Sequence, residues 1–184
     1  GNEEIIEFND SKGQKCNFIS AICGEKYTLC IFTSNSSKSN QLAYFHGRHS
    51  SASPLFIDTK GRSPDFLFGG RDTAAVVDSK GAILIINENV FSWGEKSLEW
   101  SILPGGEQAK SVAFCTQFVI AADWKGQVFE ASLAKWKKGV APSFKIVPEL
   151  SGIEVVEVAG KSEHCFAVCK DGSVFGRGSN SRGK

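Results

Sequence analysis

The sequence predicts an all-β protein built from four copies of one sheet-forming repeat. Three observations predict it: short apolar runs rich in Val, Ile and Phe, glycine-containing turns between these runs, and recurrence of the pattern at a fixed interval. Helical periodicity is nearly absent, and only residues 127–136 are ambiguous in this respect. Four short strands in roughly 45 residues are the size of one blade of a β-propeller, so we expect that architecture.

The repeat is clearest near the end of the sequence. His164 begins an apolar run, Gly172 follows eight residues later, and the apolar pair Val174 and Phe175 comes next. The residues equivalent to His164 in the earlier copies are Tyr27, Thr73 and Phe118. These four reference positions are separated by 46, 45 and 46 residues, which indicates a true internal repeat.

Each copy is predicted to contain its strands in a fixed order. An apolar strand leads to the reference position, a second strand that is buried on both faces begins there, and a glycine turn leads to a third strand. First strands are expected at 19–23, 66–68, 111–115 and 153–158, and third strands at 42–45, 83–86, 128–131 and from 174. The candidates for an outer, fourth strand are 55–58, 98–103 and 144–147. In the first copy Asn35 stands in the glycine position, where we expect a turn residue with positive φ.

The predicted organisation is one propeller domain over residues 1–184, a partial ring of about four blades with four antiparallel strands each. Its repeats are assigned to residues 1–47, 48–93, 94–138 and 139–184. The sequence starts at Gly1 and contains no Met, so we expect a piece of a longer protein. An arc of four blades leaves two sheet edges unpaired, and exposed edges promote aggregation. The remaining blades are therefore expected from the full-length chain or from self-association.

The last copy resembles the repeats of the regulator of chromosome condensation (RCC1-like) family. The matching residues are Gly160, His164, Ala167, Val168, Asp171, Gly172, Val174, Phe175, Gly178, Asn180 and Gly183. The resemblance implies a ring of seven blades in the complete protein. It also implies a protein-binding module with a face that docks the small GTPase Ran, where acidic and histidine side chains help to expel the nucleotide. Such guanine-nucleotide exchange is non-covalent, so we do not expect an enzyme with a catalytic residue.

Carried onto this sequence, the partner-binding face surrounds the reference positions. It consists of Glu25, Lys26, Tyr27, Arg71, Asp72, Thr73, Gln117, Glu163 and His164. Three of the four reference positions depart from the family's His, and His164 itself has a structural alternative, the ordering of its loop through hydrogen bonds. Two other functions stay open. One is a scaffold for another protein, as in relatives fused to ubiquitin-ligase or BTB-type domains, and the other is chromatin binding.

Charge and composition limit the partners. The 21 basic and 20 acidic side chains give a net charge of +1, which does not favour chromatin or other nucleic-acid binding. Most of the six cysteines lie inside apolar strand-like runs, and Cys165 and Cys169 are too far apart on one strand to bridge, so we predict a reduced, intracellular protein, nuclear or cytoplasmic. No apolar run reaches the roughly 18 residues of a membrane span, so no membrane partner is expected.

Three motifs suggest chemistry but have simpler interpretations. Gly178, Gly183 and Lys184 have the spacing of a phosphate-binding P-loop without its Ser/Thr and helix, and the repeat explains the same glycines. His46 and His49 are close together, but no Cys or carboxylate pair completes a zinc site, so we predict no metal and no cofactor. We interpret the four tryptophans as blade-packing residues; they are Trp93, Trp100, Trp124 and Trp136.

Overall fold

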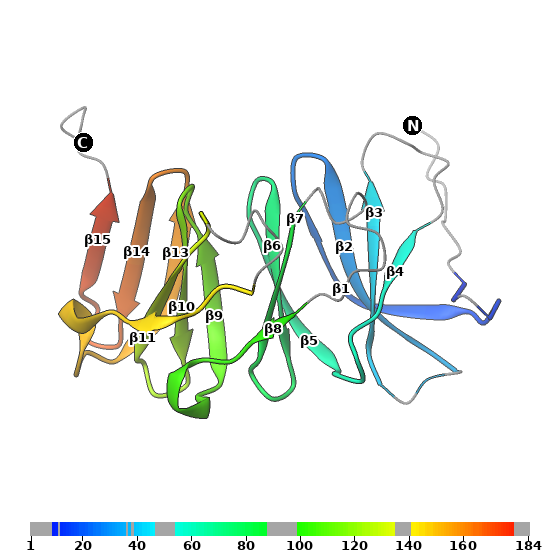
Figure 1. Ribbon diagram of the computed structural model, residues 1–184, viewed down its shortest axis with the longest axis horizontal. Coiled ribbons are helices and arrows are strands. Elements are labelled where there is room, and N and C mark those ends of the chain that lie inside the picture. Colours follow the sequence, from blue (N-terminus) through cyan, green and yellow to red (C-terminus); the bar gives the residue numbers. More distant parts are fainter. Residues whose placement is uncertain are drawn as a thin grey trace.

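The computed structural model describes residues 9–10, 12–35, 37, 39–46, 54–87, 99–134 and 141–178. These residues form four antiparallel sheets that stand side by side in a row (Figure 1). The first sheet consists of β1 (Cys16–Cys23), β2 (Tyr27–Ser34), β3 (Gln41–His46) and β4 (Leu55–Ile57), and the second of β5 (Pro64–Gly69), β6 (Thr73–Asp78), β7 (Ile83–Asn87) and β8 (Trp100–Ser101). The third consists of β9 (Ala109–Phe114), β10 (Phe118–Asp123), β11 (Val128–Ser132) and β12 (Lys145–Ile146), and the fourth of β13 (Val155–Lys161), β14 (His164–Cys169) and β15 (Val174–Gly178).

This arrangement confirms the predicted all-β class. The strands of every sheet follow one another in sequence order, as in a propeller blade, and every second strand begins at its reference position. The fourth sheet differs from the prediction of four strands, because only three of its strands lie within the described residues. From here on each sheet is called a blade, numbered in chain order.

Blades and sequence repeats are out of phase. The outer strand β4 falls in the sequence segment 48–93, yet it pairs with β3 of the first blade, and β8 and β12 are placed in the same way. Each segment therefore begins with the outer strand of one blade and continues with the inner strands of the next. As a result, each such segment contributes strands to two neighbouring blades and joins them through the covalent chain.

The core lies between the blades, because alternate residues of each second strand face opposite neighbours. In β10, Val119 and Ala121 belong to the apolar cluster between the second and third blades. Ile120 and Ala122 belong to the cluster between the third and fourth blades. Both faces of the strand are thus buried, and this explains why its sequence is apolar throughout.

The hairpin turns after the second strands of the second and third blades use an aspartate as a backbone acceptor. Asp123 Oδ1 accepts the N–H groups of Lys125 at 2.9 Å and of Gln127 at 2.8 Å, and Asp78 makes the same pair of bonds. Gly126 has a φ of 85°, and an added Cβ there would lie 2.7 Å from the backbone nitrogen of Val155. Asn35 lies in a turn, as predicted, but it is not among the described residues with positive φ.

The side-chain predictions have mixed outcomes. All six cysteines are free thiols, five of them buried and Cys23 exposed. Trp100 packs against the cluster between the first two blades, whereas Trp124 is 64% exposed on a hairpin turn and is not a packing residue. Trp93, Trp136 and His49 lie outside the described residues. Within the described part of the chain, no helix is long and apolar enough to cross a membrane, and no three potential metal ligands gather.

Candidate protein-binding face

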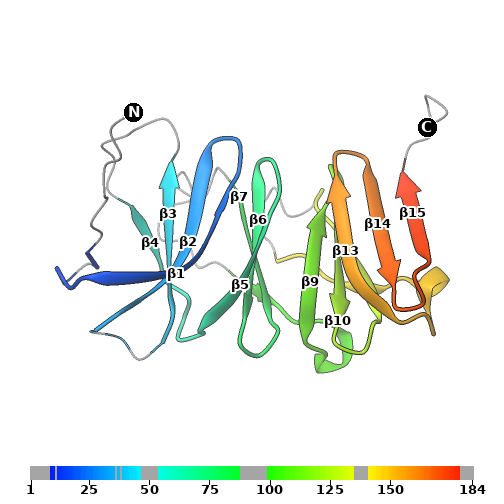
Figure 2. The same cartoon turned by 180° about the vertical axis from the view of Figure 1, so that it is seen from behind.

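The residues predicted to bind a partner lie in or beside four short turns, each of which joins the first and second strands of a blade. The first strands all run in one direction and the second strands in the other, so the four turns occupy the same edge of the row, uppermost in Figure 2. We call this edge the turn face and define it as residues 24–27, 70–73, 115–118 and 161–164.

Hydrogen bonds fix the backbone of these turns. Gly24 N–H donates to the carbonyl of Tyr27 at 2.9 Å, and Gly70 N–H donates to the carbonyl of Thr73 at 2.7 Å. The third turn closes in the same way, and the fourth contains Ser162 with a φ of 54°. Gly24 cannot carry a side chain, because an added Cβ would run into the ring of Tyr27. The side chains of the turn face are thus presented from a well-defined backbone.

Tyr27 belongs to the blade interface and not to the surface. Its side chain is buried, and its hydroxyl oxygen lies 2.8 Å from the carbonyl of Thr73 and 3.1 Å from that of Gly70. Burial raises the pKa of Tyr27 to about 12. The first reference residue therefore fastens the first blade to the turn of the second, and it is not available to a partner.

A cluster of charged side chains spans the first two turns. Arg71 Nε donates to Glu25 Oε2 at 2.5 Å, and Asp72 Oδ2 lies 3.9 Å from the same nitrogen. The side chains of Arg71, Asp72 and Glu25 are 78%, 49% and 46% exposed. The hydrogen bond and the charge of Arg71 lower the pKa of Glu25, and Glu25 raises that of Arg71. Both groups stay charged near neutral pH, so the first two turns carry a fixed, solvent-accessible pattern of opposite charges.

The third and fourth turns are also joined to each other. Thr116 N–H donates to the carbonyl of Ser162 at 2.6 Å, and the thiol of Cys115 lies 3.4 Å from the carbonyl oxygen of His164. Gln117, Glu163 and His164 are exposed. The ring of His164 lies over Gly178, where an added Cβ would be 2.5 Å from its Cδ2.

The structure thus divides the predicted residues into two groups and one exception. Glu25 and Asp72 both pair with Arg71 at the first two blades, beside half-buried Lys26 and Thr73. Gln117, Glu163 and His164 lie on the same edge at the last two blades. The exception is Tyr27.

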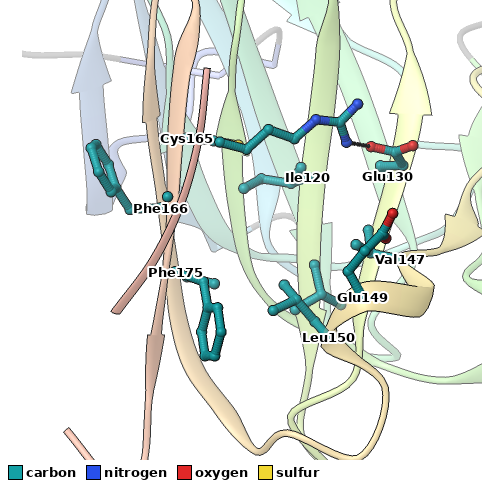
Figure 3. Close-up of a pocket in the computed structure, with 12 residues that line it drawn as sticks. Ile120, Glu130, Val147, Glu149, Leu150, Cys165, Phe166 and Phe175 are labelled. Carbon is teal, nitrogen blue, oxygen red and sulfur yellow. Dashed lines mark hydrogen bonds and ion pairs between the residues drawn. The ribbon is translucent and has the colours of Figure 1, made fainter. Parts of the chain in front are cut away.

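The sequence did not predict a hollow of about 280 Å³ between the third and fourth blades. Its walls include Val147, Leu150 and Phe175, and all three are labelled in Figure 3. Arg177 and Glu130 also line the hollow. Arg177 donates to Glu130 at 2.5 Å, and its Cζ lies 5.1 Å from the centroid of the Phe118 ring. One feature of the sequence could have indicated this site. Arg177 occupies a position at which the other repeats have the apolar residues Phe45, Ile86 and Ala131.

Comparison with known proteins identifies the repeat. Residues 155–184 match the family model of the regulator of chromosome condensation (RCC1) repeat, which agrees with the strand order of the fourth blade. The last part of the chain is therefore similar to an RCC1 repeat. No curated protein sequence matches it.

Solved structures extend the likeness over nearly the whole chain. The human WBSCR16 structure is 13% identical, with a TM-score of 0.69, over 93% of this chain and 49% of that one. The structure of yeast RCC1 (Prp20) bound to Kap60 is 12% identical, with a TM-score of 0.62, over 98% of this chain and 50% of that one. Prp20p from Saccharomyces cerevisiae is 12% identical, with a TM-score of 0.60, over 88% and 45%. At these identities the fold is what is shared: the chain is an RCC1-type β-propeller in architecture and spans about half the length of these structures.

Proposed function

We propose that this RCC1-type propeller is a non-catalytic module that binds a protein partner through its turn face. The observation that carries the proposal is the exposed cluster of Glu25, Arg71 and Asp72, held by hydrogen-bonded turns of two blades. Fixed charges on a rigid edge suit electrostatic recognition of a protein surface. The fold neighbours agree with such a role, since yeast RCC1 binds Kap60 and Prp20p was characterised for its binding to Gsp1p and histones.

The partner we propose first is a Ran-like small GTPase, in an intracellular setting, nuclear or cytoplasmic. Exchange requires only that the propeller binds the nucleotide-free GTPase more tightly than the nucleotide-bound form. Asp72 on the second turn, and Glu163 and His164 on the fourth, supply the acidic and imidazole groups that the family resemblance implies.

Release of fluorescent GDP from Ran tests this proposal. The chain at micromolar concentration is expected to accelerate release. Replacing both Asp72 and Glu163 with Ala is expected to reduce the acceleration roughly 30-fold, since each lost charge contact at an interface costs about 1 kcal/mol. Glu154→Ala is the matched control, because Glu154 is also exposed and ion-paired, with Lys170 at 2.9 Å. Release at the intrinsic rate in the presence of the propeller would refute exchange on Ran.

A scaffold that binds a different protein is the second candidate. The observation that favours it is the loss of histidine at three reference positions, together with the use of Tyr27 inside the blade interface. Affinity capture with the chain, compared with a Glu25→Ala, Arg71→Ala variant, separates the two proposals. A partner other than a GTPase that the variant fails to retain would support the scaffold, and capture of a Ran-like GTPase alone would contradict it.

Chromatin binding stays the least favoured alternative, because the net charge of +1 supplies no strong attraction to nucleic acid. A shift of nucleosomes in electrophoresis that persists at physiological salt would support it.

A further inference from the structure

Two buried cysteines lie on opposite sides of the interface between the third and fourth blades. Cys115 begins the third turn, and Cys165 is the second residue of β14 (Figure 3). Both belong to the apolar cluster between these blades. The thiol of Cys115 lies 3.4 Å from the carbonyl oxygen of His164, the residue that precedes Cys165. The Cys115 side chain is therefore directed across the interface toward β14.

Gly160 shows how close the two thiols are to each other. This glycine is the direct partner of Cys165 in the pairing of β13 with β14, and directly opposed residues have Cβ positions about 5 Å apart. A Cβ added at Gly160 would lie 3.2 Å from Cys115 Sγ. The Cys115 thiol thus occupies the space that a side chain at position 160 would fill, next to the Cys165 side chain.

The other two blade interfaces have no thiol at the equivalent positions. Their equivalent residue pairs are Gly24 with Ala74, and Gly70 with Val119. Between the second and third blades the small and large residues are exchanged: Phe114 stands at the position of Gly160, and a Cβ added at Gly70 would lie 3.2 Å from the Phe114 side chain. A thiol packed on a glycine is therefore specific to the third interface.

The two thiols differ in how easily they ionise. Burial raises the pKa of Cys165, whereas its hydrogen bond with Cys115 and the positive charge of Arg177 oppose this rise. Burial and the neighbouring Cys165 raise the pKa of Cys115 to about 12. Cys165 is thus the thiol of the pair that ionises first. Because both pKa values are raised, the closeness of the two sulfur atoms, and not unusual acidity, distinguishes this pair.

We propose that Cys115 and Cys165 form a reversible disulfide that joins the third and fourth blades when the protein is exposed to a peroxide. The Cys165 thiolate attacks one oxygen of hydrogen peroxide and becomes a sulfenic acid, and the hydroxide that leaves takes up the thiol proton as water. Cys115 Sγ then attacks the sulfenic sulfur; the S–S bond forms, the S–O bond breaks, and a second water leaves with the Cys115 proton. A dithiol reductant reverses the reaction by thiol–disulfide exchange and is itself oxidised to a disulfide.

The disulfide fastens two turns of the turn face to each other. Cys115 is part of the third turn and Cys165 follows the fourth, and Thr116 N–H already donates to the carbonyl of Ser162 between them. The bond closes residues 115–165 into a loop, which restricts the unfolded chain and so stabilises the folded one. In a reducing compartment the pair stays as thiols until an oxidant arrives, as is usual for redox-sensing cysteines.

Peptide mapping after oxidation tests the pairing. The reduced chain is treated with hydrogen peroxide at pH 8, its remaining thiols are blocked with iodoacetamide, and it is digested with trypsin. The expected product is peptide 111–125 linked to peptide 162–170, with the mass of two hydrogens lost, and it disappears on treatment with dithiothreitol. Since peptide 162–170 also contains Cys169, Cys169→Ala is the matched control that keeps the linked product, whereas Cys165→Ala loses it. Absence of the linked product from the wild type, or its presence in Cys165→Ala, would overturn the proposal.

Urea denaturation of the oxidised chain, with and without dithiothreitol, measures what the bond does to the fold. The oxidised wild type is expected to have a urea midpoint roughly 1–2 M above that of the reduced protein, as for a disulfide that closes a long loop. In Cys165→Ala the two midpoints are expected to coincide. A linked wild type whose midpoint equals that of the reduced protein would contradict the joining of the two blades. Neither measurement involves a partner, so failure here is distinct from failure of the proposed function.

Discussion

The third and fourth blades contain the same dipeptide in very different surroundings. Val128 and Phe129 in β11 are 2% and 1% exposed, whereas Val174 and Phe175 at the equivalent positions in β15 are 58% and 43% exposed. Residue type does not cause this difference; the neighbours do, because β11 lies between two strands and two blades. Each repeat is thus stabilised mainly by the units beside it, as in other repeat proteins.

Replacing each of the two phenylalanines with alanine tests this explanation most directly. Phe129→Ala should lower the free energy of unfolding by about 3–5 kcal/mol, because it leaves a cavity between two blades. Phe175→Ala should lower it by roughly 1 kcal/mol, because that ring is already partly in solvent. Urea denaturation measures both losses of unfolding free energy, provided that each variant keeps the m-value of the wild type. Equal losses for the two variants would show that exposure does not set the difference.

The turn aspartates provide a second, smaller contrast between the same blades. Asp123 is 1% exposed and its Oδ1 accepts two backbone N–H groups, whereas exposed Asp171 bonds Ser173 N–H at 2.9 Å and Ser173 Oγ at 2.6 Å. Asp123→Ala should cost about 2–3 kcal/mol, because two backbone N–H groups lose the acceptor that the buried carboxylate supplies. Asp171→Ala should shift the urea midpoint far less, because water can replace its oxygen. A comparable midpoint shift for both variants would contradict this explanation.

Local patterns predicted the elements that depend on neighbours in sequence. The apolar run after each reference position marked β2, β6, β10 and β14, because a strand buried on both faces has no polar alternation. The turn glycines marked Gly81, Gly126 and Gly172, which all have positive φ. Both signals are contained in fewer than ten consecutive residues.

Contacts between blades could not be predicted from such short stretches of sequence. Tyr27 and Arg71 make their main contacts with residues 46 positions away in the sequence, and nothing adjacent to them indicates which one is buried. The phase shift between repeats and blades was missed for a related reason: pairing partners of the short outer strands lie in the preceding repeat. The hollow lies between two blades that are distant in the sequence, and Arg177 is the wall residue that stands where the other repeats have apolar residues.

Tyr27 allows the first blade interface to be compared with the third, where the equivalent residue is Phe118. Tyr27→Phe should lower the free energy of unfolding by about 1 kcal/mol at pH 8, the usual net value of a hydrogen bond. Because the folded-state pKa is raised from 10 to about 12, the neutral hydroxyl stabilises the fold fully below pH 10, and this contribution is lost as pH rises toward 12. The stability difference between wild type and variant, measured from pH 8 to 12, should shrink accordingly. A constant difference over this range would contradict the assignment of the hydroxyl to the interface.

The smallest expected effect distinguishes the two interblade arginines. Arg177 stacks on Phe118 and pairs with Glu130, so Arg177→Ala should cost about 1 kcal/mol. Arg71 is 78% exposed, and water and salt screen its pair with Glu25, so Arg71→Ala should leave the urea midpoint unchanged within error. The same Arg71→Ala chain should bind its partner more weakly, with the difference from wild type declining as NaCl is raised toward 0.5 M, where the Debye length falls to about 4 Å. A residue whose replacement weakens binding without changing the free energy of unfolding belongs to a recognition surface. A loss of stability without a loss of binding would instead assign the Glu25–Arg71 pair to the joint between the first two blades.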